Sequence, residues 1–359
     1  VRLTSGDALD AILTGSGLTL SLVSASTGAL LVSDSASGGN RRLQASGLAA
    51  GRYAVRVTGT GASRVAYTLT PSISSSQSCV DDGAAPNDSA ATAYELDDTG
   101  LLDGSYQVGS LMTCGSSDAD WFKISLPGSK QVAVQLGFNP ADDVDLEVAE
   151  PRGTSGLTRT LARSYATSVQ DRMGGVMNVG GEVFVRAVGY RSTPIAYQIG
   201  VEVSALPSSS CVDDRFDTWT ATSGSSTTAV TNDTSSSATV LSSGESLPQL
   251  KVCTGNKDFY KIAASTGQTL RVHVAYTHST SGDIDVRLYG PSNQTTPLAT
   301  CTTVSNNTGT GLTCSSAGVD GTEDLVLPVA SAEAGDHFIE VIEYGSDGSN
   351  SYDLSVTVE

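Results

Sequence analysis

The chain has 359 residues, which is enough for two or three domains with sizeable cores. Its 38 acidic and 20 basic side chains give a formal net charge of −18. This acidic excess repels phosphate groups, so it argues against nucleic acid and anionic membrane surfaces as partners. No apolar run is long enough to cross a bilayer, which argues against membrane insertion.

The first segment, residues 1–73, consists of short runs in which apolar and polar residues alternate. Val1 opens directly inside such a run, so we expect the chain to be a mature or trimmed part of a longer precursor. The later runs are LTLSLVSASTGALL at 18–31, GRYAVRVTG at 51–59 and VAYTLT at 65–70. A period of two with β-branched and aromatic residues predicts strands with one buried face.

The second and third segments repeat one order of motifs. ISSSQSCVDD at 73–82 and ALPSSSCVDD at 205–214 open them, and an Asn-Asp pair follows in PNDSAATAYEL at 86–96 and TNDTSSSATVL at 231–241. Aromatic strands come next, DADWFKISL at 118–126 and NKDFYKIAA at 256–264. The closing strands are EVFVRAVGY at 182–190 and DHFIEVIEY at 336–344.

The first segment matches only the later part of this order. We therefore predict three domains: a partial unit at 1–73 and complete units at 79–204 and 211–359. The missing strands of the partial unit are expected from residues upstream of Val1 or from another chain. Many short strands per unit, with turn residues between them, predict an all-β fold of tandem β-sandwiches.

Six cysteines occur, and none belongs to a Cys-x-x-Cys pair, so metal–thiolate spacing is absent. Disulfides in an oxidising compartment are the better interpretation. Two pairs recur at the same points of the two complete units and would fasten each linker to its sandwich, while the third would clasp a hairpin. The pairs are Cys79 with Cys114, Cys211 with Cys253, and Cys301 with Cys314.

The repeated Asn-Asp pair has three competing interpretations. Asp88 before Ser89 could cap a turn of helix. Asn87 and Asn232 both stand in N-glycosylation sequons. The pair could also supply oxygen ligands to a metal ion.

The order of these motifs resembles the bacterial pre-peptidase C-terminal domain family, which includes the collagen-binding domains of clostridial collagenases. The resemblance is carried by Asn-Asp-Ser at 87–89, Gly-Ser-Leu at 109–111, Asp-Trp-Phe at 120–122, Asp-Val-Asp-Leu at 143–146, Gly-Glu-Val-Phe-Val at 181–185, and Tyr197. It implies jelly-roll-like β-sandwiches, found at the ends of secreted proteases and other exported proteins. It also implies that the units are not catalytic.

In calcium-binding members of that family, the linker and the sandwich share a calcium ion. The matching residues in the middle unit are Asn87, Asp88, Ser110, Asp118 and Asp120. Those in the last unit are Asn232, Asp233 and Asp258, with Asn256 where the middle unit has an aspartate. The resemblance therefore predicts the stronger calcium site in the middle unit, although Ala84, Ala85 and Pro86 stand where family members carry a glutamate.

No catalytic constellation is recognisable: there is no Gly-x-Ser-x-Gly elbow and no His-Glu-x-x-His. Two hypotheses follow for an extracellular or cell-surface, non-enzymatic protein. The first is a structural array, such as a surface stalk or filament subunit, whose partners are other copies or upstream domains joined through exposed strand edges. The alternative is a targeting or processing appendage of a secreted hydrolase that binds an insoluble extracellular polymer.

Overall fold

The computed structural model describes the chain except for residues 4–7, 16, 35–39, 46–50, 60–63, 75–81, 97–103, 115–117, 140–141, 154–155, 166–170, 191–193, 209–210, 224–225, 280–281, 300, 305–312, 319–320 and 346–347. Strands make up 65% of the structure, and the sheets are dominated by antiparallel pairs. The predicted all-β class is confirmed. The chain divides into two compact units, Val1–Val80 and Asp81–Glu359.

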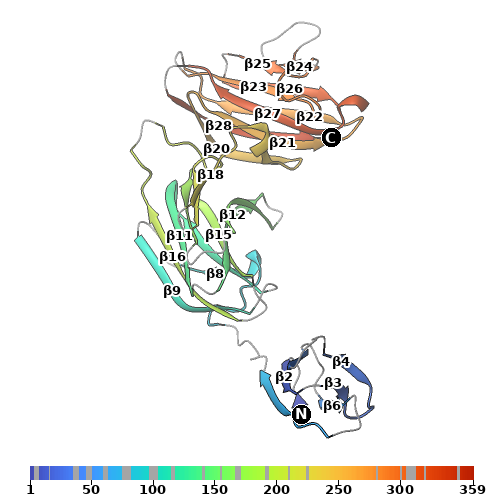
Figure 1. Cartoon of the computed structure of the whole chain (residues 1–359). Coiled ribbons are helices and arrows are strands. Elements are labelled where there is room, and N and C mark those ends of the chain that lie inside the picture. The colour runs from blue at the N-terminus through green and yellow to red at the C-terminus, as the bar shows by residue number, and fades with distance from the viewer. Residues whose placement is uncertain are drawn as a thin grey trace. The chain divides into compact units, whose positions relative to one another are not determined.

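The first unit is a small sandwich of two sheets, with strand orders β1-β6-β3-β4 and β5-β2-β7 (Figure 1). Its core consists of alternate leucines and alanines from the facing strands, such as Leu9 and Leu13 on one sheet and Leu20 and Leu22 on the other. The strands are β1 (Arg2–Leu3), β2 (Ala8–Thr14), β3 (Leu18–Ser24), β4 (Leu30–Ser33), β5 (Asn40–Ala45), β6 (Gly51–Gly59) and β7 (Thr68–Ser74).

The second unit holds two further sandwiches. The middle sandwich pairs a five-stranded sheet, β13-β12-β15-β10-β8, with a six-stranded sheet, β18-β17-β14-β11-β16-β9. Its strands are β8 (Tyr94–Glu95), β9 (Gly104–Thr113), β10 (Ala119–Leu126), β11 (Lys130–Phe138), β12 (Val144–Arg152), β13 (Leu157–Ser164), β14 (Asp171–Met177), β15 (Gly181–Gly189), β16 (Ile195–Ser204), β17 (Trp219–Ser223) and β18 (Ser226–Val230).

The last sandwich repeats this plan with the strand orders β19-β21-β27-β23-β25 and β20-β28-β22-β26-β24. Its strands are β19 (Thr239–Val240), β20 (Glu245–Cys253), β21 (Lys257–Ala264), β22 (Thr269–Tyr276), β23 (Ile284–Tyr289), β24 (Thr303–Val304), β25 (Ser315–Ser316), β26 (Thr322–Pro328), β27 (Gly335–Glu343) and β28 (Ser349–Val358). One continuous apolar cluster runs through the middle and last sandwiches, so their cores meet at the junction between them.

The Asn-Asp segments enter both complete sandwiches in the same way. Each leads into a short 3-10 turn, η1 (Ala90–Thr92) or η2 (Ser235–Ser237), and then into a two-residue strand that pairs in parallel with the aromatic strand. A third turn, η3, spans Ser331–Glu333. The N-cap of η1 is Ser89, so the predicted capping role of Asp88 is wrong. In both segments the linker joins the sheet through backbone pairing, and at η2 Thr234 and Ser237 also form a capping box.

The hairpin β17–β18 lies between the Cys-Val-Asp-Asp and Asn-Asp motifs of the last unit, where the middle unit has only Gly-Ala-Ala-Pro. Sequence repetition assigns it to residues 211–359, but β17 hydrogen-bonds to β14 and extends the sheet of the middle sandwich. Trp219 is fully buried there, over Gly175. A Cβ atom at Gly175 would lie 2.4 Å from the indole ring, so this glycine provides the space that the ring fills.

Trp219→Ala should lower the free energy of unfolding by about 3–5 kcal/mol, because it removes a fully buried aromatic side chain and leaves a cavity. Urea denaturation of the purified chain measures this change. Thr228→Ala, an exposed position on the same hairpin, serves as the control and should leave stability nearly unchanged. Equal stability of the two variants would show that Trp219 does not anchor the hairpin.

Candidate metal centre

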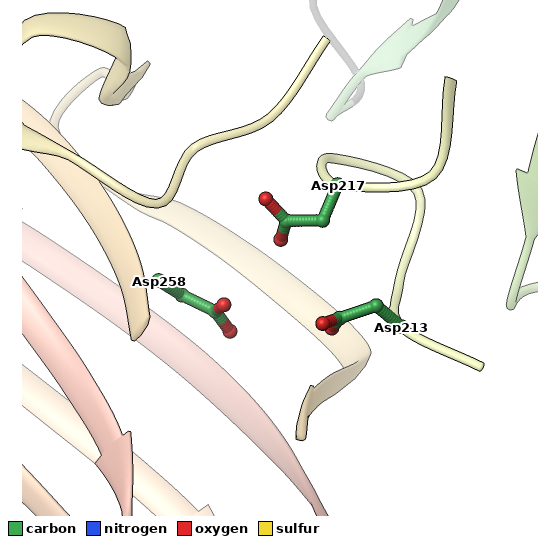
Figure 2. Close-up of side chains that lie close together, drawn as sticks. All are labelled: Asp213, Asp217 and Asp258. Carbon is green, nitrogen blue, oxygen red and sulfur yellow. The ribbon is translucent and has the colours of Figure 1, made fainter. Parts of the chain in front are cut away.

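Three carboxylates converge where the linker after Cys211 meets the last sandwich. Asp213 and Asp217 come from the linker, and Asp258 comes from β21. One oxygen from each lies within 4.8 Å of the others, and Figure 2 shows the three side chains turned toward one another. Among the described residues, this is the only group of three such side chains that meets this spacing. Converging carboxylate oxygens are the ligands that Ca²⁺ prefers.

Asp258 is the fully buried member of this cluster. Its Oδ2 atom accepts a hydrogen bond from the hydroxyl of Tyr352, whose oxygen lies 2.7 Å from that of Tyr260. Its Oδ1 atom is buried and has no hydrogen-bond partner in the described part of the chain. A buried carboxylate oxygen without a donor is costly unless a cation or a proton compensates it.

Asn232 borders the cluster beside Asp217. Its backbone N–H donates to Oδ1 of Asp217 at 2.6 Å, and one end of its side-chain amide lies 2.5 Å from both carboxylate oxygens. With Nδ2 on that side the amide donates to the carboxylate. This orientation satisfies both groups, since with Oδ1 on that side the amide and carboxylate oxygens would face each other. The carboxylate oxygens of Asp213, Asp217 and Asp258 are therefore the ligands that would hold a calcium ion here.

Burial is the main cause of the raised pKa values at this junction. It raises the pKa of Asp217 to about 8 and that of Asp214 to about 7, and repulsion from neighbouring aspartates adds to the effect. The pKa values of Asp258 and Asp213 are raised in the same direction and for the same reasons. The positive charge of Arg215 opposes the rise in the pKa of Asp214, as do two backbone donors, Phe216 N at 2.8 Å and Lys251 N at 3.0 Å.

The middle sandwich reproduces part of this arrangement. Tyr197 donates to Asp120 at 2.6 Å, as Tyr352 does to Asp258. The carbonyl of Asn87 accepts the N–H of Trp121 at 2.8 Å, which matches the bond from Phe259 to Asn232. Both amide atoms of Asn87 are buried without a hydrogen-bond partner among the described residues. Part of the polar framework is thus repeated, and Asn87 remains a candidate ligand.

The other residues that the resemblance assigned to calcium lie in different surroundings. Asp118 accepts the N–H of Cys114 at 2.5 Å. Ser110 is exposed at a bulge of β9 with φ of 60°, and Asp88 is exposed. Asp233 is partly exposed, and its Oδ1 atom is buried without a partner in the described structure.

Sequence reasoning missed two of the three converging carboxylates. Asp213 belongs to the repeated Cys-Val-Asp-Asp motif, which was interpreted only as a linker. Asp217 lies in the stretch Arg-Phe-Asp-Thr-Trp, which has no counterpart in the middle unit. The resemblance predicted the stronger site in the middle unit, yet the described carboxylates converge more closely in the last one. The insertion contributes Asp217 to the last unit, whereas Asp81, the middle unit's counterpart of Asp213, lies outside the described residues.

Burial also bears on the glycosylation interpretation. Asn87 is fully buried and Asn232 almost fully buried. Their amide nitrogens are therefore inaccessible to modification in the folded chain, whereas Asn293, in a third sequon, is exposed.

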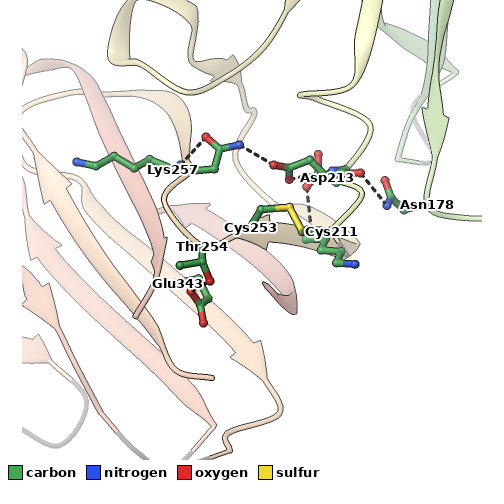
Figure 3. Close-up of a disulfide and its surroundings, with 10 residues drawn as sticks. Asn178, Cys211, Asp213, Cys253, Thr254, Lys257 and Glu343 are labelled. Carbon is green, nitrogen blue, oxygen red and sulfur yellow. Dashed lines mark hydrogen bonds between the residues drawn. A yellow bond between two sulfur atoms is a disulfide. The ribbon is translucent and has the colours of Figure 1, made fainter. Parts of the chain in front are cut away.

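A disulfide joins Cys211 to Cys253 directly beside the cluster, with a Cα–Cα distance of 6.0 Å (Figure 3). Asn256, in the turn between β20 and β21, donates to Asp213 at 2.6 Å, so the linker is held to the last sandwich both by the disulfide and by a hydrogen bond. Cys301 pairs with Cys314 at a Cα–Cα distance of 5.2 Å. Both predicted pairings are confirmed and indicate an oxidising environment. Cys79 lies outside the described residues, so its pairing with Cys114 stays a prediction.

No family model and no curated protein matches the chain. Solved structures with partial likeness include the PBSX exported protein XepA, at 12% identity and a TM-score of 0.25, covering 73% of this chain and 89% of that one. The extracellular domain of ANXUR2 from Arabidopsis thaliana has 9% identity and a TM-score of 0.21, covering 71% and 89%. Tripeptidyl peptidase 2 has 9% identity and a TM-score of 0.26, covering 98% and 29%. Likeness this weak supports no functional inference.

None of the helical segments in the described ranges is long and apolar enough to span a membrane.

In chelator, the melting temperature should fall as pH rises from about 4 to about 8. Carboxyls whose pKa is higher in the folded state stabilise the protein fully below their unfolded pKa, about 4, and lose that contribution as pH passes their folded values, about 7 for Asp214 and about 8 for Asp217. Calcium should reduce this fall, because the cation replaces the protons. Differential scanning calorimetry at several pH values, with calcium or with EDTA, measures both effects.

Asp217→Asn should remove the response to calcium and lessen the loss of stability at high pH, because it removes one buried charge. Asp88→Asn is the matched control, since this aspartate is exposed and lies outside the cluster. Identical melting curves in calcium and EDTA at pH 8 for the unmodified chain would refute the metal centre.

Proposed function

We propose that the protein is a non-enzymatic structural component of an extracellular array, such as a surface stalk or filament subunit, in which β-sandwiches are held at fixed angles. The observation that supports this proposal is the junction between the middle and last sandwiches. There, a disulfide, a buried ion-pair network, a shared apolar core and the aspartate cluster occupy one short linker. Each of these restricts movement between the two sandwiches, as a rigid support requires.

The ion-pair network joins both sandwiches to the linker. Arg215, in the linker and 2% exposed, donates to Glu150 of β12 at 2.7 Å and to the carbonyl of Pro248 in β20 at 3.2 Å. Arg159 of β13 donates to the same Glu150 at 3.0 Å and also pairs with Glu245 of β20. Arg159 thus bridges acids of both sandwiches, and Arg215 joins Glu150 of the middle sandwich to the backbone of the last one. Breaking a buried pair leaves an uncompensated charge, so the network opposes separation of the sandwiches.

Aromatic packing reinforces these ion pairs. Phe216 is buried, and the guanidinium groups of Arg215 and Arg159 contact its ring, with Cζ atoms 4.9 Å and 5.5 Å from the ring centroid. The same ring meets Tyr260 of the last sandwich edge-on at a centroid distance of 6.1 Å. The linker therefore packs as core, whereas a flexible linker would stay solvated.

Calcium fits this proposal as a further fastening of the same linker. When bound, the ion would neutralise the aspartates and join the linker ligands, Asp213 and Asp217, to Asp258 of the sandwich. The resemblance to pre-peptidase C-terminal domains points in the same direction, because calcium joins linker to sandwich in members of that family. In this interpretation the protein supports or spaces other parts of an assembly, and its partners are further copies or other domains of the same precursor.

Spin labels introduced as unnatural amino acids at Tyr190 and Tyr344, each 72% exposed, test rigidity by pulsed electron resonance. Tyr190 follows β15 of the middle sandwich and Tyr344 follows β27 of the last one. The unmodified junction should give one narrow distance distribution. Arg215→Ala should broaden it, because both bridging contacts are lost. Arg271→Ala, which removes only an exposed pair with Glu359, is the control and should leave it narrow. A broad distribution in the parent protein would contradict the rigid junction.

Electron microscopy of the purified chain with calcium, at increasing concentration, tests the array itself. End-to-end assemblies are the expected result. If the chain stays dispersed and is instead retained on collagen, chitin or cellulose, the structural proposal is wrong and the protein is a targeting appendage.

A further inference from the structure

The six-stranded sheet of the middle sandwich, β18-β17-β14-β11-β16-β9, has an outer face that points away from the core (Figure 1). Along β11, Val132, Val134 and Leu136 are fully buried, so the residues between them point outward. The pairing register aligns these outward residues in rows that cross the strands. One such row consists of small side chains and one glutamate: Thr220, Gly174, Ala133, Glu202 and Ser105.

Longer polar side chains border this row of small residues. The neighbouring row on one side consists of Thr222, Arg172, Gln135, Gly200 and Gln107. On the other side lie Gln131 and the linker residues Pro207 and Val212. The small row is therefore the floor of a groove across the strands. Two pockets, of about 240 Å³ and about 620 Å³, lie along it and share Ala133 and Arg172.

Two glycines in this groove, Gly174 and Gly200, are not required by the fold. Neither has a positive φ, and a Cβ atom at either position would lie 3.8 Å from its nearest neighbour, which is ordinary contact. Gly175 differs, because Trp219 fills the space beside it. Glycine inside a strand weakens it, and where packing does not require it, it often marks the close approach of a ligand.

The last sandwich shows that the same sheet can be built without the groove. Phe138 pairs with Tyr197 as Tyr276 pairs with the equivalent Tyr352, so Ala133 and Arg271, each five residues earlier, are equivalent positions. Their neighbours Gly174 and Val326 are equivalent in turn. The last sandwich therefore has a long and a branched side chain where the middle one has alanine and glycine. The groove belongs to the middle sandwich and is not a consequence of the fold.

The two rows also differ in charge between the sandwiches. At the positions of Gln135 and Arg172, the last sandwich has His273 and Asp324, which contact each other at 2.7 Å. In the middle sandwich, Arg172 and Glu202 are the charged residues that line the smaller pocket, and their charges cancel. The chain as a whole carries a net charge of −18, so this balance sets the pocket apart from the acidic surface and favours an uncharged ligand.

The polar groups of the smaller pocket are mainly amides. Gln107, Gln135 and Gln198 line it, and all three side chains are exposed. Each amide can both donate and accept hydrogen bonds, as the hydroxyl groups of a sugar do. Tyr106 also lines the pocket but packs against the core, so it offers no ring for stacking. Recognition here depends on hydrogen bonds along an extended ligand.

We propose that the outer face of the middle sandwich binds an uncharged polysaccharide, which lies as an extended chain across the strands in this groove. Gly174 and Gly200 let the sugar rings approach the sheet, and the bordering amide and guanidinium groups bind their hydroxyls. With strands about 4.8 Å apart, the row from Thr220 to Ser105 spans roughly 20 Å, enough for several sugar units. An extended polypeptide fits less well, because its backbone groups find partners at a strand edge and not on a sheet face.

Affinity gel electrophoresis of the full chain tests this proposal with four uncharged polysaccharides: hydroxyethyl cellulose, xyloglucan, galactomannan and laminarin. At least one of them should slow migration, whereas the polyanion alginate should not. Isothermal titration calorimetry with oligosaccharides of the polymer that binds should show tighter binding of the hexasaccharide than of the disaccharide, because the longer chain contacts more of the groove.

Ala133→Arg introduces the residue that the last sandwich carries at this position, and it should weaken binding roughly tenfold or more by filling the groove. Gly174→Val, which copies Val326, should act in the same direction. Ala196→Arg is the matched control: Ala196 is exposed on the outer face of the same sheet, four residues before Gly200, and lines neither pocket. It should leave binding unchanged. Thermal unfolding of each variant verifies that the sandwich remains folded.

Failure of all four polysaccharides to slow the parent chain would overturn the proposal, as would binding that Ala133→Arg leaves intact. Retention on collagen without any response to the polysaccharides would show that the ligand is a polypeptide, and the proposal would again be wrong. The inference goes beyond the proposed structural role and does not depend on it. The array can fail to form in electron microscopy while the polysaccharide still binds, so the two proposals are tested separately.

Discussion

Carboxylates that leave water must be hydrogen-bonded, paired or neutralised, and the junction between the middle and last sandwiches buries several of them around one linker. The negative charges of Glu150 and Glu245 are compensated by ion pairs with Arg159 and Arg215, and all four side chains are buried or nearly so. The aspartates beside them accept hydrogen bonds, and Arg215 and Lys251 lower the pKa values of Asp214 and Asp213, yet burial still raises the pKa of each aspartate above its usual value. The position of the linker therefore depends on what neutralises this second group, and protons or a divalent cation can do so.

The inserted hairpin makes this burial possible. A linker as short as the one in the middle unit, Gly-Ala-Ala-Pro, carries no side chain large enough to seal a junction between two sandwiches. In the last unit the chain first adds two strands to the preceding sheet, and Trp219 closes over Gly175. The inserted segment buries Arg215 and Phe216, and it places the carboxylate of Asp217 where it accepts a hydrogen bond from the backbone N–H of Asn232. The same insertion thus creates both the rigid contact and the acidic cluster.

Much of the fold was predictable because its signals are local. Period-two runs identified most strands, and the recurrence of cysteines predicted the bridge from Cys211 to Cys253. The hairpin boundary was not predictable in this way. Alternation in Trp-Thr-Ala-Thr-Ser indicates a strand but not which sheet it joins, since that choice depends on a glycine in the distant strand β14. Only Asp258 of the three clustered carboxylates was predicted, because it matches a family motif. Asp213 belongs to a motif interpreted as a linker, and Asp217 lies in an insertion that no repeat aligns.

The three sandwiches together act as an internal comparison of what this fold requires. Strand β7 keeps the interior pattern of β16 and β28, with Tyr67 where they have Tyr197 and Tyr352, although nothing described covers it. The remaining core of the first unit comes from β2 and β3, whose leucines are buried without that additional strand. A position kept apolar and aromatic while it stays exposed lowers solubility unless something covers it. The sequence of β7 is therefore better suited to a covered strand than to a free edge.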